Sequence, residues 1–260
     1  MNSVIEVLQI TDCHLLADPE ENLKGHNPER RLEAVIAGAR NKLQQQRKSG
    51  AKADHLLLTG DLAQQAQLSV YQRILKKTAE LATNTHWIPG NHDNSALMAE
   101  FVGMDNKVVI DGNWAIVLLD STANPDGRGS GSLSDQELAL ISTLSDLSVE
   151  HILLVLHHPP VEVGSVWQDQ IKLGNAQQFW QRVNKLDKVR AVLFGHLHQE
   201  HQLQHRGTVL YCSPATAPQF KKSQLTPILE DDTKLAAPGY RLLQLEADGS
   251  IKTKVYRVDC

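Results

Sequence analysis

Five short segments of the sequence place aspartate, asparagine or histidine side chains directly after an apolar run. The segments are TDCH with Asp12 and His14, TGD with Asp61, PGNHD with Asn91 and His92, HHPP with His157 and His158, and GHLH with His196 and His198. Carboxylate, amide and imidazole groups without thiolates suit Mn, Fe or Zn in a catalytic site rather than a structural zinc site. The sequence therefore predicts a metal centre built from distant parts of the chain.

The backbone pattern of these segments favours side chains that converge. In an extended chain, residues i and i+2 point to the same side, so Asp12 with His14, and His196 with His198, each present two ligands together. Glycines at positions 60, 90 and 195 permit the sharp turns that convergence requires. We therefore interpret the five segments as one site.

The predicted ligands are too numerous for a single ion. They are Asp12, His14, Asp61, Asn91, His157, His196 and His198. Seven side chains suit two ions that share a bridging carboxylate. In the HHPP segment we favour His157 as the ligand, because it is the first residue beyond the predicted strand, and His158 is the alternative.

The charge of such a site indicates the chemistry that it supports. Two divalent ions and two aspartates leave a net charge of about +2, which implies an anionic substrate. Two ions about 3.5–4 Å apart lower the pKa of a bridging water, hold a phosphoryl oxygen and align an in-line displacement. The predicted reaction is therefore the hydrolysis of a phosphate ester.

The elements that must position these ligands follow an α/β rhythm, in which apolar β-branched runs alternate with helical patterns. Strands are expected at 4–10, 54–58, 86–88, 115–119, 152–156, 191–194, 208–211, 240–246 and 251–257, and helices at 28–48, 68–82, 94–102, 134–144 and 175–185. Five of the strands end at candidate ligands, where open α/β sheets place their sites. The segment EADG between the last two strands signals a hairpin, so a mixed sheet is expected.

Composition narrows the class of protein. The chain has 260 residues, of which 41% are hydrophobic and 22% charged, and this predicts a single globular domain over 1–260. A net charge of −4 argues against a nucleic-acid or membrane-surface partner. The start of the chain lacks the pattern of a signal peptide, and the three cysteines are odd in number and far apart. We therefore expect a cytoplasmic protein without a disulfide framework.

The ordered motifs D-x-H, G-D, G-N-H-D, H-x-P and G-H-x-H resemble those of the calcineurin-like metallophosphoesterase superfamily. The chain is more closely similar to the bacterial class III 3′,5′-cyclic AMP phosphodiesterases. That similarity includes GSLSDQELALI, LVLHHPPVEVG and the tail CSPATAPQF…APGYRLLQLEADGSIKT, and it extends over nearly the whole length. It implies a four-layer αββα sandwich with two mixed β-sheets. Cys13 is a departure, because many relatives carry threonine or serine there; we expect its side chain in the core.

The resemblance also divides the ligands between two ions, for which Fe and Mn are expected and Zn is possible. It implies that Asp61 bridges both ions and takes part in catalysis. The first ion would be held by Asp12, His14, Asp61 and His198, and the second by Asp61, Asn91, His157 and His196. The side chains expected to face the substrate are Asn91, His92, His14 and His198.

His92 follows a predicted ligand without being needed as one, and in the resembling family it lies beside the phosphate. We interpret it as a group that stabilises the phosphoryl oxygens or protonates the leaving 3′ oxygen, with Asp93 orienting its ring. The structural alternative is a histidine that caps the following helix.

The function implied by the resemblance is hydrolysis of 3′,5′-cyclic AMP to 5′-AMP by in-line attack of a metal-bound hydroxide. One alternative is a metallophosphoesterase that acts on a glycerophosphodiester, a 2′,3′-cyclic nucleotide or a phosphomonoester. Another is a non-catalytic scaffold, which the complete ligand set disfavours. The substrate is expected to be selected by a long loop at about 212–240, in which Phe220 is a candidate for stacking on a base. The sequence leaves the oligomeric state open.

Overall fold

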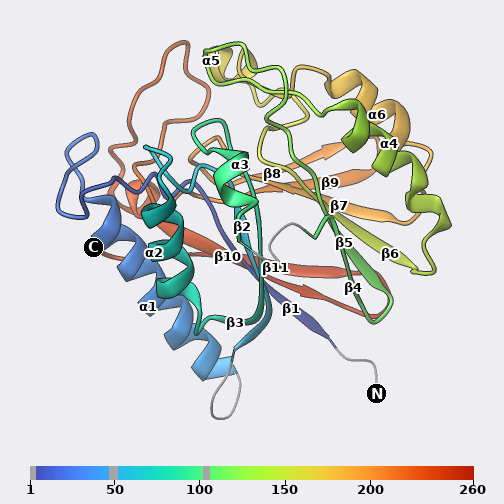
Figure 1. The fold of residues 1–260 in the computed structure, drawn as a ribbon, viewed down its shortest axis with the longest axis horizontal. Helices are drawn as coiled ribbons and strands as arrows, with labels where there is room; N and C mark the ends of the chain where they lie inside the picture. The colour runs from blue at the N-terminus through green and yellow to red at the C-terminus, as the bar shows by residue number, and fades with distance from the viewer. Residues whose placement is uncertain (1–3, 47–51, 102–105) are drawn as a thin grey trace.

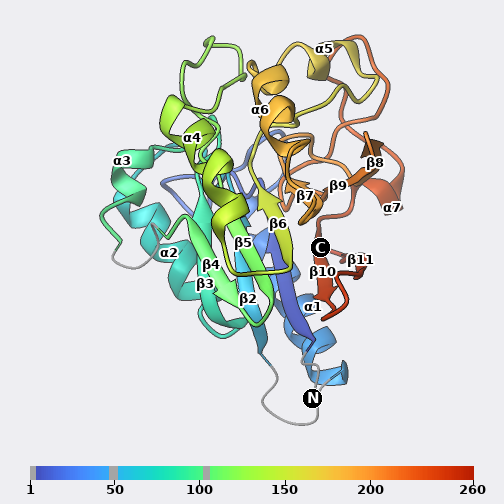
Figure 2. The same ribbon diagram turned by 90° about the vertical axis from the view of Figure 1, so that its right-hand side faces the viewer.

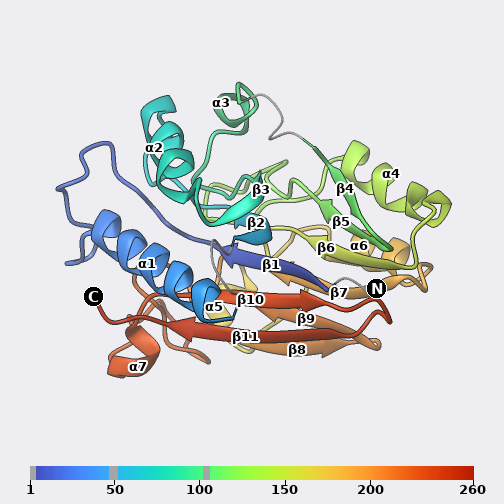
Figure 3. The same cartoon turned by 90° about the horizontal axis from the view of Figure 1, so that it is seen from below.

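The computed structural model describes residues 4–46, 52–101 and 106–260, and two β-sheets form its centre (Figure 1). The first sheet has the order β11-β10-β1-β2-β3. Its strands are β1 (Ile5–Ile10), β2 (Ala53–Thr59), β3 (Ala82–Ile88), β10 (Gly239–Leu245) and β11 (Ile251–Arg257). The pairs β1-β2 and β2-β3 are parallel, whereas β10 joins β1 and β11 in antiparallel pairs. Figure 3 shows β10 between β1 and β11.

The second sheet is also mixed and has the order β4-β5-β6-β7-β9-β8. Its strands are β4 (Val108–Asp111), β5 (Trp114–Leu118), β6 (His151–Val155), β7 (Val189–Phe194), β8 (His201–His205) and β9 (Thr208–Cys212). Strands β5, β6, β7 and β9 are parallel neighbours, and β4 and β8 close the two edges in antiparallel pairs. The predicted hairpin and mixed sheets are confirmed.

Three apolar clusters define four layers. Inward-facing residues of both sheets, including Val7, Leu57 and Leu153, pack between the sheets. A second cluster joins the outer face of the first sheet to α1 (Pro28–Gln46) and α2 (Leu68–Thr78), and it includes the buried Cys13. A third joins the other sheet to α4 (Asp135–Thr143) and α6 (Ala176–Val183). Figure 1 shows these helix pairs on opposite sides of the sheets, so the predicted αββα sandwich is confirmed.

Several predicted boundaries were wrong. The strand expected at 86–88 begins at Ala82, because parallel pairing with β2 continues through exposed polar residues that carry little apolar signal. The helix expected to end at 82 ends at Thr78, after which a turn leads into β3. The helix expected at 94–102 is the single turn α3 (Ser95–Met98), and its last predicted residue lies outside the described residues, as do 47 and 48.

Short or edge elements were not predicted. They are β4, β8, α5 (Val166–Asp169), α7 (Thr233–Ala236) and a 3₁₀ turn at Leu144–Asp146. Figure 2 places α5 and its neighbouring loops at one end of the molecule, beyond the ends of β6 and β7. None of the helices in the described parts of the chain is long and apolar enough to span a bilayer.

The segment predicted as a long loop connects β9 to β10 and contains only the short helix α7. The buried Arg31 and the half-buried Arg257 donate to several of its backbone carbonyls, some of which would otherwise lack partners away from water. Arg31 of α1 donates to the carbonyl oxygens of Thr216, Ala217 and Ala236 at 2.7, 3.2 and 3.0 Å. Arg257 of β11 donates to those of residues 235 and 237 at 2.8 and 2.7 Å. The loop is therefore fixed to the first sheet and its helix layer.

Replacing Arg31 by methionine should lower the free energy of unfolding by about 1–3 kcal/mol, because buried carbonyls lose charged donors. The matched control is Arg30→Met, since Arg30 is an exposed neighbour whose ion pair among the described residues is with exposed Glu20. That control should change stability by no more than about 0.5 kcal/mol. Urea unfolding of both variants measures the difference, and equal stability of the two would contradict the role of Arg31.

Candidate metal centre

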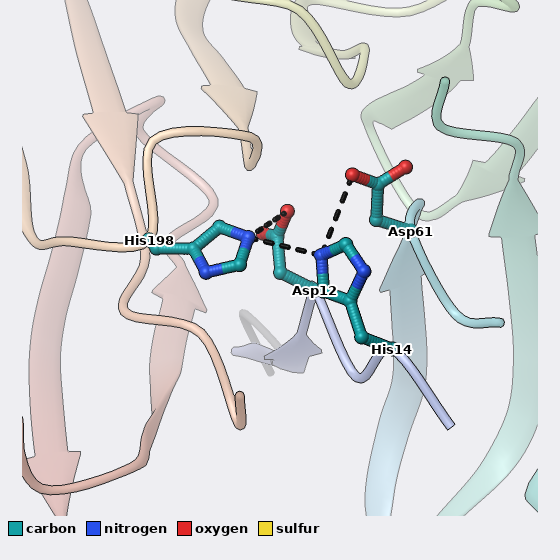
Figure 4. Close-up of side chains that lie close together, drawn as sticks. All are labelled: Asp12, His14, Asp61 and His198. Carbon is teal, nitrogen blue, oxygen red and sulfur yellow. Dashed lines mark hydrogen bonds and ion pairs between the residues drawn. The ribbon is translucent and has the colours of Figure 1, made fainter. Parts of the chain in front are cut away.

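Four predicted ligands meet at the carboxyl ends of β1, β2 and β7 (Figure 4). One ligand atom from each of Asp12, His14, Asp61 and His198 lies within 4.8 Å of all the others. The Nε2 atoms of His14 and His198 are 3.0 Å apart, and His14 Nε2 is 3.5 Å from Asp61 Oδ2. His198 Nε2 is 3.5 Å from Asp12 Oδ1. All four side chains are buried, and their ligand atoms are close enough to coordinate one ion.

A second group shares Asp61 with the first. It consists of Asp61, His157 and His196, whose ligand atoms also lie within 4.8 Å of one another. His157 Nε2 is 3.4 Å from Asp61 Oδ2 and 3.1 Å from His196 Nδ1. Two ligand sets with one carboxylate in common are the arrangement that a two-ion site requires.

Asn91 and His158 differ in whether their side chains already have hydrogen-bond partners. The Oδ1 atom of Asn91 is buried and has no hydrogen-bond partner among the described residues, and this side chain lines the same cavity as His196. In contrast, His158 is engaged elsewhere, with Nδ1 2.8 Å from Ser121 Oγ and Nε2 3.2 Å from Gly129 O. An unpartnered buried amide oxygen fits a cation ligand, and the geometry favours His157 over His158.

Hydrogen bonds at Nδ1, the nitrogen that faces away from the site, orient three of the imidazoles. His14 Nδ1 lies 2.8 Å from Gln64 Oε1, His157 Nδ1 2.8 Å from Thr59 O, and His198 Nδ1 2.8 Å from Pro218 O. Oxygen acceptors require a proton on each Nδ1, so each Nε2 presents its lone pair to the site. Sequence reasoning missed Gln64, because a lone glutamine after a G-D motif carries no recognisable signal.

The backbone at the site is strained. Of the nine non-glycine residues with positive φ in the described chain, five are predicted ligands: Asp12, His14, Asp61, His196 and His198. Such conformations cost about 1–3 kcal/mol each and persist only where the surroundings impose them. Convergence is therefore achieved by left-handed turns at the ligands themselves, in addition to the predicted glycines. A Cβ at Gly60 would collide with His157, and one at Gly195 with Thr11.

Asp93 has a different role from the one expected. Its carboxylate accepts the backbone N–H groups of Leu62, Ala63 and Gly90 at 3.0–3.1 Å and the Tyr71 hydroxyl at 3.2 Å. These donors occupy the carboxylate, so it ties the loop after β3 to the loop after β2 and does not orient His92. Asn94, not His92, caps α3 by accepting the N–H groups of residues 96 and 97.

His92 faces the cavity and contacts other site residues. Its ring centroid lies 4.8 Å from that of His14, and its backbone N–H donates to Asp61 Oδ1 at 2.9 Å. Gln64 Nε2 lies 3.3 Å from His92 Nδ1. Because Gln64 Oε1 accepts from His14, its amide nitrogen is the donor toward His92. The Nε2 atom of His92 then carries the ring proton.

The pKa values of three buried imidazoles suit metal ligands, whereas that of His157 is raised by its anionic neighbour. Burial lowers the pKa of His14 to about 4 and the pKa values of His196 and His198 well below their usual range, so all three are neutral near pH 7. Burial disfavours the charged form of His157, yet Asp61 beside it raises its pKa to about 9. Burial also opposes ionisation of Asp61, but His157 and His14 hold its pKa well below the usual range. The site therefore favours an anionic Asp61 beside cations.

Five of the predicted ligands line a cavity of about 300 Å³. His14, Asp61, Asn91, His196 and His198 line its base together with His92. Other lining residues come from three loops, with Lys24, Gly129 and Phe220, and from the short helix α5, with Trp167. The cavity is large enough for a small phosphoester in direct reach of the candidate metal ligands.

Replacing Asp61 by alanine should remove a ligand from both groups at once. We expect the Mn-loaded variant to retain fewer than two ions per chain after gel filtration, as measured by elemental analysis. The control is Asp146→Ala, which removes an exposed carboxylate from a surface turn. Two tightly held ions in Asp61→Ala would refute a shared ligand.

The fold and the sequence are similar to those of known proteins. The structure aligns with a dimetal phosphatase from Danio rerio at a TM-score of 0.62 and 12% identity, covering 98% of this chain and 99% of that one. The chain is 35% identical to the 3′,5′-cyclic adenosine monophosphate phosphodiesterase CpdA of Vibrio vulnificus, covering 98% of this chain and 90% of the relative. It is 34% identical to a 3′,5′-cyclic-nucleotide phosphodiesterase of Nostoc, covering 98% and 92%. The model of the calcineurin-like phosphoesterase family matches residues 5–200, and this chain belongs to that family.

Proposed function

We propose that this protein hydrolyses 3′,5′-cyclic AMP to 5′-AMP as a metal-dependent phosphodiesterase. The observation that carries the proposal is the pair of ligand groups sharing Asp61 at the base of a cavity. The full-length similarity to cyclic AMP phosphodiesterases supplies the substrate. A cytoplasmic location stays a prediction.

The residues present suit two divalent cations, for which we propose Fe or Mn, with Zn as the alternative. One would be held by Asp12, His14, Asp61 and His198, and the other by Asp61, Asn91, His157 and His196. Bound ions polarise a phosphoryl oxygen and lower the pKa of water, so that a nucleophile is available near neutral pH.

The protein's own contribution at the phosphate centres on His92. The proton on its Nε2 is set by Gln64 and is available to a phosphoryl oxygen or to the leaving 3′ oxygen. Asp61 fixes the backbone of His92 through Oδ1, so the bridging ligand and the proton donor are held together. His14 and His198 also line the cavity, so a bound substrate would lie beside them.

Chelator-treated protein should lose all turnover of cyclic AMP, and Mn or Fe should restore it, because the proposed reaction needs bound cations to activate water at the ligand groups. The measurement compares kcat/KM on cyclic AMP, 2′,3′-cyclic AMP, a glycerophosphodiester and a phosphomonoester. Cyclic AMP should be the best substrate. A higher kcat/KM on another member of this series would replace the proposed substrate, and turnover without metal would overturn the mechanism.

His92→Ala should keep its metal content and fold and lose about 10²–10⁴ in kcat on cyclic AMP. If His92 is the general acid, the loss should be much smaller on an aryl phosphodiester, whose leaving group needs little protonation. Equal losses on both substrates would assign it to the phosphoryl oxygens instead. Unchanged kcat on cyclic AMP would remove His92 from the mechanism.

A further inference from the structure

The cavity extends beyond the metal ligands to an aromatic wall. Phe220 lies beside His198 with ring centroids 5.2 Å apart, and Trp167 meets Phe220 at 5.0 Å with the ring planes at 71°. Both aromatic side chains line the cavity. A group stacked on this wall would therefore lie next to a substrate phosphate held at the base.

The aromatic wall is fixed to the metal-site backbone. Phe220 donates its N–H to His198 O at 3.1 Å, and Gln168, next to Trp167, donates to Leu197 O at 2.9 Å. Phe220 and Gln168 are thus hydrogen-bonded to the segment after β7, which carries the predicted ligands His196 and His198. A platform held in this way loses little freedom when a ligand binds, which favours affinity.

Two polar groups at the wall match the edge and the face of a heterocyclic base. The indole Nε1 of Trp167 is buried without an acceptor in the described part of the chain. Lys24 Nζ lies 4.5 Å from the centroid of the Phe220 ring. Nucleobases offer ring-nitrogen acceptors and a π face, to which N–H donors, aromatic rings and cations bind.

The turn that carries Lys24 is built to present it. Leu23 and His26 exchange backbone hydrogen bonds at 2.7 and 3.1 Å, which places Lys24 at the tip. Lys24 itself has a φ of 50°, a conformation that a lysine adopts only at a cost. The strained turn holds the ammonium beside the Phe220 ring of the aromatic wall.

Resting on the proposed function, we propose that Trp167 and Phe220 form the nucleobase subsite of this enzyme, with the Lys24 ammonium at its edge beside the Phe220 ring. The base of the cyclic nucleotide stacks against the two rings while its phosphate lies on the metal ligands. These three residues then determine why a cyclic nucleotide is preferred to a phosphodiester without a base.

The test compares cyclic AMP with methyl riboside 3′,5′-cyclic phosphate, which has the same reacting ring but no base. In Trp167→Leu and Phe220→Leu, kcat/KM on cyclic AMP should fall about 5- to 150-fold, the range for loss of one base–aromatic stack, mainly through KM. The baseless substrate should change by less than about 2-fold. Trp167→Phe should lose less kcat/KM on cyclic AMP than Trp167→Leu. Lys24→Met should also lower kcat/KM on cyclic AMP, and Lys24→Arg should lower it less, because arginine keeps the positive charge.

Controls separate a base subsite from a packing role. Val166→Ala alters the exposed neighbour of Trp167 and should leave both substrates unaffected. Equal losses on the two substrates, or loss of bound metal in Phe220→Leu, would show that the rings only support the metal segment and would overturn the subsite. Wild-type enzyme that hydrolyses both substrates equally well would also overturn it, while leaving the proposed function intact. Turnover of the baseless diester but not of cyclic AMP would instead overturn the proposed function.

Discussion

The shared carboxylate of Asp61 is the constraint around which the rest of the site is arranged. It lies buried between His14 on one side and His157 on the other, within 3.5 Å of an Nε2 atom of each. A buried anion needs compensating charge and hydrogen-bond donors, because desolvation alone would protonate it. The N–H of His92 supplies one donor at Oδ1, and the neighbouring imidazoles face Oδ2. Two cations would complete this compensation, and the histidines that burial keeps neutral are ready to hold them.

Both sheets must contribute for this constraint to be met. Asp12 and Asp61 follow strands of the first sheet, whereas His157 and His196 follow strands of the second. The apolar layer between the sheets therefore sets the distance between the two halves of the site. Asp12 also accepts the backbone N–H of His196 at 3.0 Å, so a hydrogen bond spans the sheets at the metal centre itself. Fold stability and site geometry depend on the same contact.

The loop between β9 and β10 links the fold to substrate choice. Its carbonyls are held by arginines from α1 and β11, and Pro218 O orients His198 from behind. Two residues later, Phe220 faces the cavity. A segment without regular secondary structure can thus be as well positioned as a strand, because its buried backbone groups have partners.

The site was largely predictable from sequence because its motifs combine residue type, order and position after apolar strands. The seven ligand positions follow from that pattern, and the structure brings their side chains together. The fold class was predictable for the same reason, since buried strands carry strong apolar signals. Strands β4 and β8 lie at sheet edges, and β8 (HQLQH) has one apolar residue, so its pairing is decided by neighbours that are distant in sequence.

The missed roles depend on tertiary contacts. Gln64 matters because His14 and His92 lie on either side of its amide, and neither is near it in sequence. Asp93 was assigned to His92 by adjacency, yet its carboxylate accepts the N–H groups of Leu62 and Ala63 from the loop after β2 and that of Gly90 from its own turn. Arg31 is buried under the loop, where only the folded chain brings carbonyls to it.

The most direct test of the account is anomalous X-ray diffraction from crystals grown with Mn²⁺. The account predicts two anomalous peaks about 3.5–4 Å apart, one on each side of the Asp61 carboxylate. The first should be surrounded by Asp12, His14 and His198, and the second by Asn91, His157 and His196. A single peak, or a pair of peaks that does not share Asp61, would contradict it.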